Sequence, residues 1–129
     1  MPWQEIDVQA DEIINAFNVM GRPGSIVQEL SGGNQQRTLL ALLPDDLRLL
    51  ILEHPTRGLD LESTHWVWSK LLERRTQGTA ILFTSTDLDE LVENSDRIIV
   101  FSGGNMSVPL DAATMTGERL GSLIGGQGI

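Results

Sequence analysis

Three short segments that are apolar at every position constrain the fold of this sequence more than any other feature. They are Leu49–Leu52, Ala80–Phe83 and Ile98–Phe101. Strands that are apolar on both sides have to be covered on both faces, as they are in parallel sheets. A helical pattern after Asp60 and another after Asp87 separate the three segments. The alternation predicts an α/β fold in which three parallel strands are joined by right-handed helical crossovers.

The rest of the chain adds helices and one hairpin to this core. Apolar residues at helical spacing predict a helix over Ala10–Met20, and the same pattern predicts a second helix after Gly33 that Pro44 ends. The turn residues Ser102–Asn105 predict an antiparallel hairpin at one edge of the sheet, and a last helix is expected near Thr116–Ile124. Three strands alone cannot be covered on both faces, so the sequence predicts only part of a larger domain.

Charge and cysteine content exclude several classes of function. The 129 residues include 9 Lys and Arg against 18 Asp and Glu, a formal charge of -9. This charge repels nucleic acid and anionic lipid, so neither is an expected partner. The absence of Cys excludes disulfides, thiolate zinc sites and Cys nucleophiles. No apolar run approaches the roughly 20 residues that span a bilayer, and we expect a cytoplasmic chain with no direct membrane insertion.

The turn ahead of the second predicted helix has the composition of a phosphate site. Ser31 is followed by Gly32 and Gly33, and then by the helical segment. The first N–H groups of a helix lack partners and lie at the positive end of its dipole, which favours anions. The Ser31 hydroxyl adds a donor, and the glycines allow a close approach. The same three residues are also compatible with a merely flexible helix entrance.

The order of motifs along the chain resembles the ATP-binding subunits of ABC transporters. Leu30–Gln36 is similar to their signature motif, Leu49–His54 to the Walker B strand and Gly58–Asp60 to the D-loop. Ser85–Asp87 takes the place of the switch loop. The resemblance extends from Ile6 to Gly126 and implies a partial P-loop NTPase-like domain.

The residues of these motifs resemble one subgroup of the family, whose transporters import simple sugars and nucleosides. The Asn-Gln-Gln ending of the signature and the run Pro55–Asp60 carry this likeness, and Met106–Gly126 is similar to the end of a second, fused cassette. The resemblance implies one partial nucleotide-binding domain over residues 1–129. Residues 1–45 would be a remnant of the helical subdomain, and residues 46–129 a remnant of the α/β core with its hairpin and last helix.

The resemblance also implies a site completed by another chain. In the family, ATP lies between the Walker motifs of one cassette and the signature of the other, and Mg²⁺ accompanies it. The residues that would contact a γ-phosphate held by a partner cassette are Ser31, Gly32, Gly33 and Gln35. The D-loop residues Gly58, Leu59 and Asp60 would couple the two sites. Transmembrane permease subunits are the other implied partners, with the assembly at the inner face of the cell membrane.

The chain's own half of the site departs from the family pattern. The phosphate loop Gly-x-x-x-x-Gly-Lys-Ser/Thr is absent, so we expect the isolated chain to bind ATP poorly and to be inactive as an ATPase. Glu53 stands where the family has an Asp near Mg²⁺, which it would approach through water, and His54 stands at the catalytic Glu. Thr86 replaces the switch-loop His. Loss of a positioned base, here the catalytic Glu, lowers a reaction rate about 10²–10⁴-fold. The sequence therefore leaves open whether the chain is an enzyme.

Plainer interpretations of the same residues stay open. We favour His54 as a partly buried imidazole bonded to nearby backbone, and Thr86 as a helix-entrance residue. Glu53 is as readily a helix cap or a partner of Arg57 as a metal ligand. Asp60 can cap a helix and also contact a partner. The alternative for the whole chain is a non-catalytic assembly module that self-associates through an exposed sheet edge.

Overall fold

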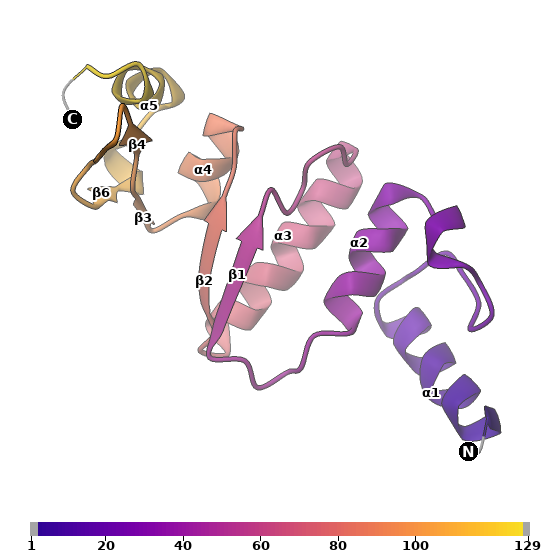
Figure 1. The fold of residues 1–129 in the computed structure, drawn as a ribbon. Helices are drawn as coiled ribbons and strands as arrows, with labels where there is room; N and C mark the ends of the chain where they lie inside the picture. The colour runs from indigo at the N-terminus through magenta and orange to yellow at the C-terminus, as the bar shows by residue number, and fades with distance from the viewer. Residues whose placement is uncertain (1–2, 128–129) are drawn as a thin grey trace. The chain divides into compact units, whose positions relative to one another are not determined.

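A computed structural model describes residues 3–127 of the chain as two compact units. The first unit ends at Leu82 and the second begins at Phe83. Helices and strands are mixed along residues 3–127, as Figure 1 shows, and they alternate one by one between Leu49 and Asn94. The predicted α/β class is confirmed by this order of elements.

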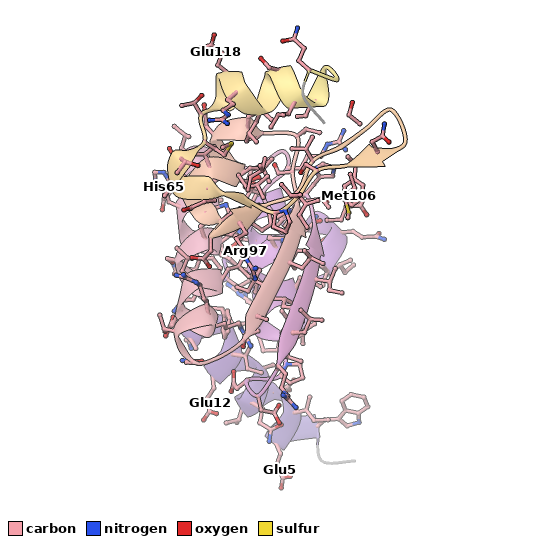
Figure 2. The ribbon with its side chains drawn as sticks, turned by 90° about the vertical axis from the view of Figure 1, so that its left-hand side faces the viewer. Glu5, Glu12, His65, Arg97, Met106 and Glu118 are labelled. Atoms are coloured by element: carbon pink, nitrogen blue, oxygen red, sulfur yellow. The ribbon has the colours of Figure 1, made fainter. Side chains whose placement is uncertain are left out.

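The first unit holds three helices and a pair of strands. The helices are α1, Trp3–Ala16, α2, Gly32–Ala41, and α3, Leu61–Thr76, with a 3-10 turn at Val27–Glu29 before α2. The strands are β1, Leu49–Glu53, and β2, Ala80–Thr84, whose last two residues belong to the second unit. α1 begins earlier than predicted and ends at Ala16, because Asn18 turns the chain with a positive φ of 50°. Glu5 and Glu12 project from α1 into solvent (Figure 2).

The pair β1 and β2 is covered on one face by α3. The two arrows run side by side in the same direction, and α3 lies against them in both views (Figures 1 and 2). The buried apolar residues of this unit are Val19, Leu40, Leu50, Val67, Trp68 and Leu71. On the opposite face Leu49 is 53% exposed, Ile51 67% and Leu82 57%. The strands are apolar on both sides, as their sequences require, but the described chain covers only one side.

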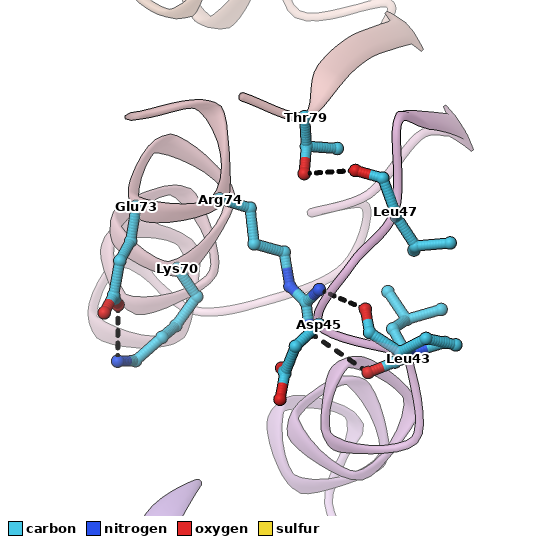
Figure 3. A network of polar contacts seen from close by, with 8 residues as sticks. Leu43, Asp45, Leu47, Lys70, Glu73, Arg74 and Thr79 are labelled. Carbon is cyan, nitrogen blue, oxygen red and sulfur yellow. Dashed lines mark hydrogen bonds and ion pairs between the residues drawn. The ribbon is translucent and has the colours of Figure 1, made fainter. Parts of the chain in front are cut away.

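Polar contacts tie the end of α3 to the segment that enters β1. Arg74 is buried, and its guanidinium donates to the carbonyls of Pro44 at 2.6 Å and Leu43 at 3.2 Å (Figure 3). Thr79, also buried, donates its hydroxyl to the Leu47 carbonyl at 2.7 Å. These bonds satisfy carbonyls of the connection between α2 and β1, which lies outside both elements.

The second unit is a small antiparallel cluster with two helices. Its helices are α4, Leu88–Asn94, and α5, Gly117–Ile124, with a 3-10 turn at Ala112–Thr114. Its strands are β3, Arg97–Ile98, β4, Phe101–Ser102, β5, Asn105–Met106, and β6, Leu110–Asp111. The core of the unit consists of Ile98, Val100, Ala112, Met115 and Leu120.

The predicted third parallel strand is wrong in detail. The segment Ile98–Phe101 is divided between β3 and β4, and each pairs antiparallel with a later strand, β6 and β5 respectively. The physical reason is the returning chain, because Ser107 donates its N–H to the Val100 carbonyl at 2.9 Å and accepts the Val100 N–H on its hydroxyl at 3.0 Å. The predicted hairpin turn is present, with positive φ at Gly103 and Gly104.

None of the helices described in residues 3–127 has the length and apolar character that crossing a membrane requires.

Candidate functional site

At the start of α2, hydrogen bonds fix the side chains of Ser31 and Asn34, while the amides of Gly32 and Gly33 have no acceptor within the helix. Ser31 is the N-cap, and its hydroxyl accepts from the Asn34 N–H at 3.4 Å and from the Asn34 side-chain amide at 2.8 Å. The amides of Gly32 and Gly33 lie in the first turn, where the helix itself offers no acceptor. The turn therefore presents N–H groups at the positive end of the α2 dipole.

Neighbouring side chains hold this turn in place. The Asn34 side-chain oxygen accepts the Met20 N–H at 2.7 Å, which ties α2 to the segment after α1. The Gln35 side-chain amide donates to the Leu30 carbonyl at 2.8 Å. Gln35 thus points back along its own chain in this structure, and the phosphate contacts of Ser31, Gly32 and Gly33 stay predictions.

The start of α3 is capped as predicted by Asp60. Its two carboxylate oxygens accept the Ser63 N–H at 2.8 Å and the Ser63 hydroxyl at 3.0 Å. These hydrogen bonds, the backbone one first, lower the pKa of Asp60 below its usual value. Asp60 stays ionised at neutral pH, with its negative charge at the favourable end of α3. Gly58, in the preceding turn, has a positive φ of 76°, which residues other than Gly rarely adopt.

The two helix starts lie against each other. A Cβ added to Gly33 would overlap the Ser63 hydroxyl and come within 3.1 Å of the Ser63 Cβ. One added to Gly32 would lie 3.7 Å from a methyl of Leu59. The structure thus brings the Ser31–Gly33 turn next to the Gly58–Asp60 turn, although 25 residues or more separate them in sequence. The absence of a side chain at Gly33 makes this approach feasible, whereas a Cβ at Gly32 would make only an ordinary contact.

A hollow of about 300 Å³ opens between these turns. The residues that line it are Asn18, Met20, Ser31, Gly33, Asn34, Arg37, Asp60, Glu62 and Ser63. It combines the N–H groups and hydroxyls of two helix starts with one guanidinium and two carboxylates. This hollow is the candidate site.

One residue of the hollow, Arg37, was not singled out from the sequence. It is only 7% exposed, and its guanidinium lies 4.1 Å from the ring centroid of Trp66 on α3. Phe17 packs edge-on against the same Trp66 ring, with centroids 6.2 Å apart. A cue existed, because residues four apart on a helix share a face and Arg37 lies four residues after Gly33.

Glu53 and His54 lie at the end of β1, in the turn that leads to Gly58. Glu53 is exposed and His54 half-buried, and His54 has an unusual positive φ of 47°. The His54 carbonyl accepts the Arg57 N–H at 3.1 Å, which closes the turn. The helix-cap interpretation of Glu53 is wrong for α3, since Asp60 is that cap. Ion pairing with Arg57 is also absent from the contacts described for residues 3–127.

The described residues form no group of three or more side chains suited to holding a metal ion. A lone Glu53 fits Mg²⁺ only in the common arrangement of one or two carboxylates with waters and substrate phosphates. Thr86 lies in the second unit, just before α4. Its neighbour Asp87 caps α4 by accepting the N–H groups of Asp89 and Glu90, both at 3.1 Å.

Comparison with known proteins gives sequence relatives of one kind. No protein-family model matches the chain. It is 38% identical over 102 residues to the arabinose import ATP-binding protein AraG of Yersinia pestis, a match that covers 78% of the chain and 20% of that protein. It is 35% identical over 131 residues to the nucleoside import ATP-binding protein NupA of Lactococcus lactis, covering 100% of the chain and 26% of that protein. The chain thus spans about a quarter or less of these relatives.

Solved structures share the fold. A metal-chelate type ABC transporter in an inward-facing conformation matches with a TM-score of 0.73 and 23% identity, over 88% of this chain and 46% of that one. The ATP-binding subunit of another ABC transporter matches with a TM-score of 0.71 and 17% identity, over 88% and 52% respectively. This chain therefore matches about half the length of each solved chain.

Proposed function

The homologues of this chain are ATP-binding proteins of sugar and nucleoside ABC importers, and from that premise we propose that it lends its signature turn to ATP hydrolysis by a partner cassette. The transported solute would be a sugar or a nucleoside, which permease subunits carry across the membrane. The observation behind this proposal is the hollow between the Ser31–Gly33 turn and the Asp60–Ser63 turn, which offers N–H groups at an exposed surface.

Each residue of the site takes a specific role in this proposal. Ser31, Gly32 and Gly33 donate to the γ-phosphate of an ATP bound by the partner, with Mg²⁺ held mainly on the partner's side. Gln35 joins them only if its amide leaves the Leu30 carbonyl. Asp60, ionised and fixed by Ser63, couples the two sites through the D-loop.

The remaining positions complete the proposed half-site. Glu53 would reach Mg²⁺ through water, and His54 and Thr86 would occupy the catalytic and switch positions without supplying the usual base. Residues 1–45 act as the helical subdomain and residues 46–129 as the α/β remainder. The chain alone has no phosphate loop and does not turn over ATP. In the assembly it lies in the cytoplasm at the inner face of the membrane. Its proposed partners do not include nucleic acid.

Two experiments test the proposal. ATP is first titrated into the chain with and without Mg²⁺, and micromolar Mg²⁺-dependent affinity would contradict it. The chain is then co-expressed with a cassette that contains an intact phosphate loop, and ATP hydrolysis is measured. Ser31→Arg and Gly33→Asp should abolish the hydrolysis that depends on this chain. Ser122→Arg, an exposed serine of α5, is the matched control and should leave it unchanged.

A second candidate function is a non-catalytic assembly module. The open face of β1 and β2, with Leu49, Ile51 and Leu82 more than half exposed, favours it. On this alternative Ser31→Arg has no effect on hydrolysis by a partner cassette. A clean monomer in size-exclusion chromatography would count against it.

A further inference from the structure

The hollow contains a buried positive charge that the chain itself does not neutralise. Arg37 is only 7% exposed, and its Nη1 has no hydrogen-bond partner among residues 3–127. The ion pairs given for those residues, Lys70–Glu73 and Arg74–Asp45, do not include it. An unpaired buried charge is destabilising, and the stacking on Trp66 offsets only part of that cost. The guanidinium therefore has capacity for a further negative group.

The carboxylates that share the hollow do not take up this capacity. Asp60 accepts two hydrogen bonds from Ser63, at 2.8 and 3.0 Å, Glu62 is exposed, and neither carboxylate lies within ion-pair distance of Arg37. Asp60 and Glu62 also repel any anion that approaches the amides of Gly32 and Gly33. Arg37 is the single cation among the described residues that line the hollow. Without it the hollow would have two negative charges and no positive one.

We infer that Arg37 is the counter-charge for a phosphoryl group bound at the amino-terminal turn of α2. This inference rests on the proposed function and deepens it, because it adds a charged residue to the uncharged donors of Ser31, Gly32 and Gly33. Arg37 is buried and lines the same hollow as Ser31 and Gly33, so the field of its charge is screened less there than at the surface. It offsets the carboxylates and makes a phosphate-sized oxyanion acceptable in the hollow.

Inorganic phosphate is the probe, titrated into the full chain at constant ionic strength with sodium chloride as the balancing salt. Amide and indole N–H signals are followed by nuclear magnetic resonance. We expect millimolar phosphate to shift the amides of Gly32 and Gly33, together with the indole signal of Trp66. The signals of Trp3 and Trp68 should stay unchanged.

Arg37→Gln removes the charge and should weaken phosphate binding about tenfold. Arg37→Lys keeps a charge without the planar stack and should bind within about threefold of the original chain. Arg48→Gln is the matched control, an exposed arginine of the same unit that does not line the hollow. Spectra without phosphate establish that each variant is folded.

Three results would overturn the inference. The first is that Arg37→Gln binds phosphate as well as Arg48→Gln does. The second, which needs no variant, is that phosphate shifts the Gly32 and Gly33 amides but not the Trp66 indole. The third is that phosphate shifts none of these signals. Failure of the proposed function would differ, since Ser31→Arg would then leave the partner's ATP hydrolysis intact.

Discussion

Replacing Gly33 by alanine tests the close contact between the two helix starts. The added Cβ would overlap the Ser63 hydroxyl and lie 3.1 Å from the Ser63 Cβ, which is closer than carbon atoms normally approach. The hydroxyl can rotate away only by giving up its 3.0 Å bond to Asp60, and the Cβ cannot rotate away at all. The two helix starts have to separate instead.

The expected cost follows from these distances. Overpacking of this kind typically destabilises by about 1–3 kcal/mol, and the better helix propensity of alanine returns less than about 1 kcal/mol. We expect Gly33→Ala to lower the free energy of unfolding of the first unit by about 1–2 kcal/mol. In a chain that already contains Ser63→Gly, Gly33→Ala should cost little, because the obstructing atoms are then gone.

Urea unfolding followed by tryptophan fluorescence measures this effect. All three tryptophans, Trp3, Trp66 and Trp68, belong to the first unit, so the signal reports on that unit alone. Gly24→Ala is the matched control, since a Cβ there meets nothing within 4 Å. If Gly33→Ala is as stable as Gly24→Ala, the argument that Gly33 is required by its contact with Ser63 is refuted.

Three further predictions concern polar groups elsewhere in the chain. Arg74→Ala leaves the carbonyls of Leu43 and Pro44, between α2 and β1, without their donor and should lower the free energy of unfolding of the first unit by about 2–3 kcal/mol in urea, whereas the exposed Arg22→Ala should cost little. The pKa of Asp60 is lowered by its hydrogen bonds, so its contribution to stability is complete above its usual pKa of 3.8 and is lost as the pH falls below that value. The free energy of unfolding, measured with urea from pH 6 to pH 2, should therefore fall less steeply for Asp60→Asn, which can still cap α3. The same pH profile for both proteins would contradict this. Ser107→Ala leaves the buried Val100 N–H without an acceptor and should destabilise the second unit by about 1–2 kcal/mol, seen as faster hydrogen exchange of that amide.

Local signals in the sequence were sufficient for the caps and turns. Asp60 caps α3 through the Ser63 N–H, and Gly103 and Gly104 form the hairpin turn, because these features depend on residues only a few positions apart. The apolar run Ile98–Phe101 was placed in the wrong sheet. Its composition identifies an extended segment, but the choice of partner strand is decided by distant residues such as Ser107.

The residues of the candidate site were harder to predict from the sequence than the helix start at which it lies. Ser31, Gly32 and Gly33 follow from the helix start, but their place beside the start of α3 was not predicted and comes from the structure. Arg37 stacks on Trp66, which lies 29 positions later in another helix, and no repeating pattern in the sequence predicts this contact. Nothing in the pattern of the sequence connects the two residues, so only their proximity in the structure identifies the pair.

The uncovered face of β1 and β2 has a consequence for how the protein is handled. Repulsion between copies arises from the net charge of -9, and dissolved salt weakens it over a screening length of about 10 Å at 0.1 M. Apolar attraction between open sheet faces is not weakened in this way. Light scattering should therefore find larger particles as sodium chloride rises, and dilute buffer is the better choice for storing the purified chain.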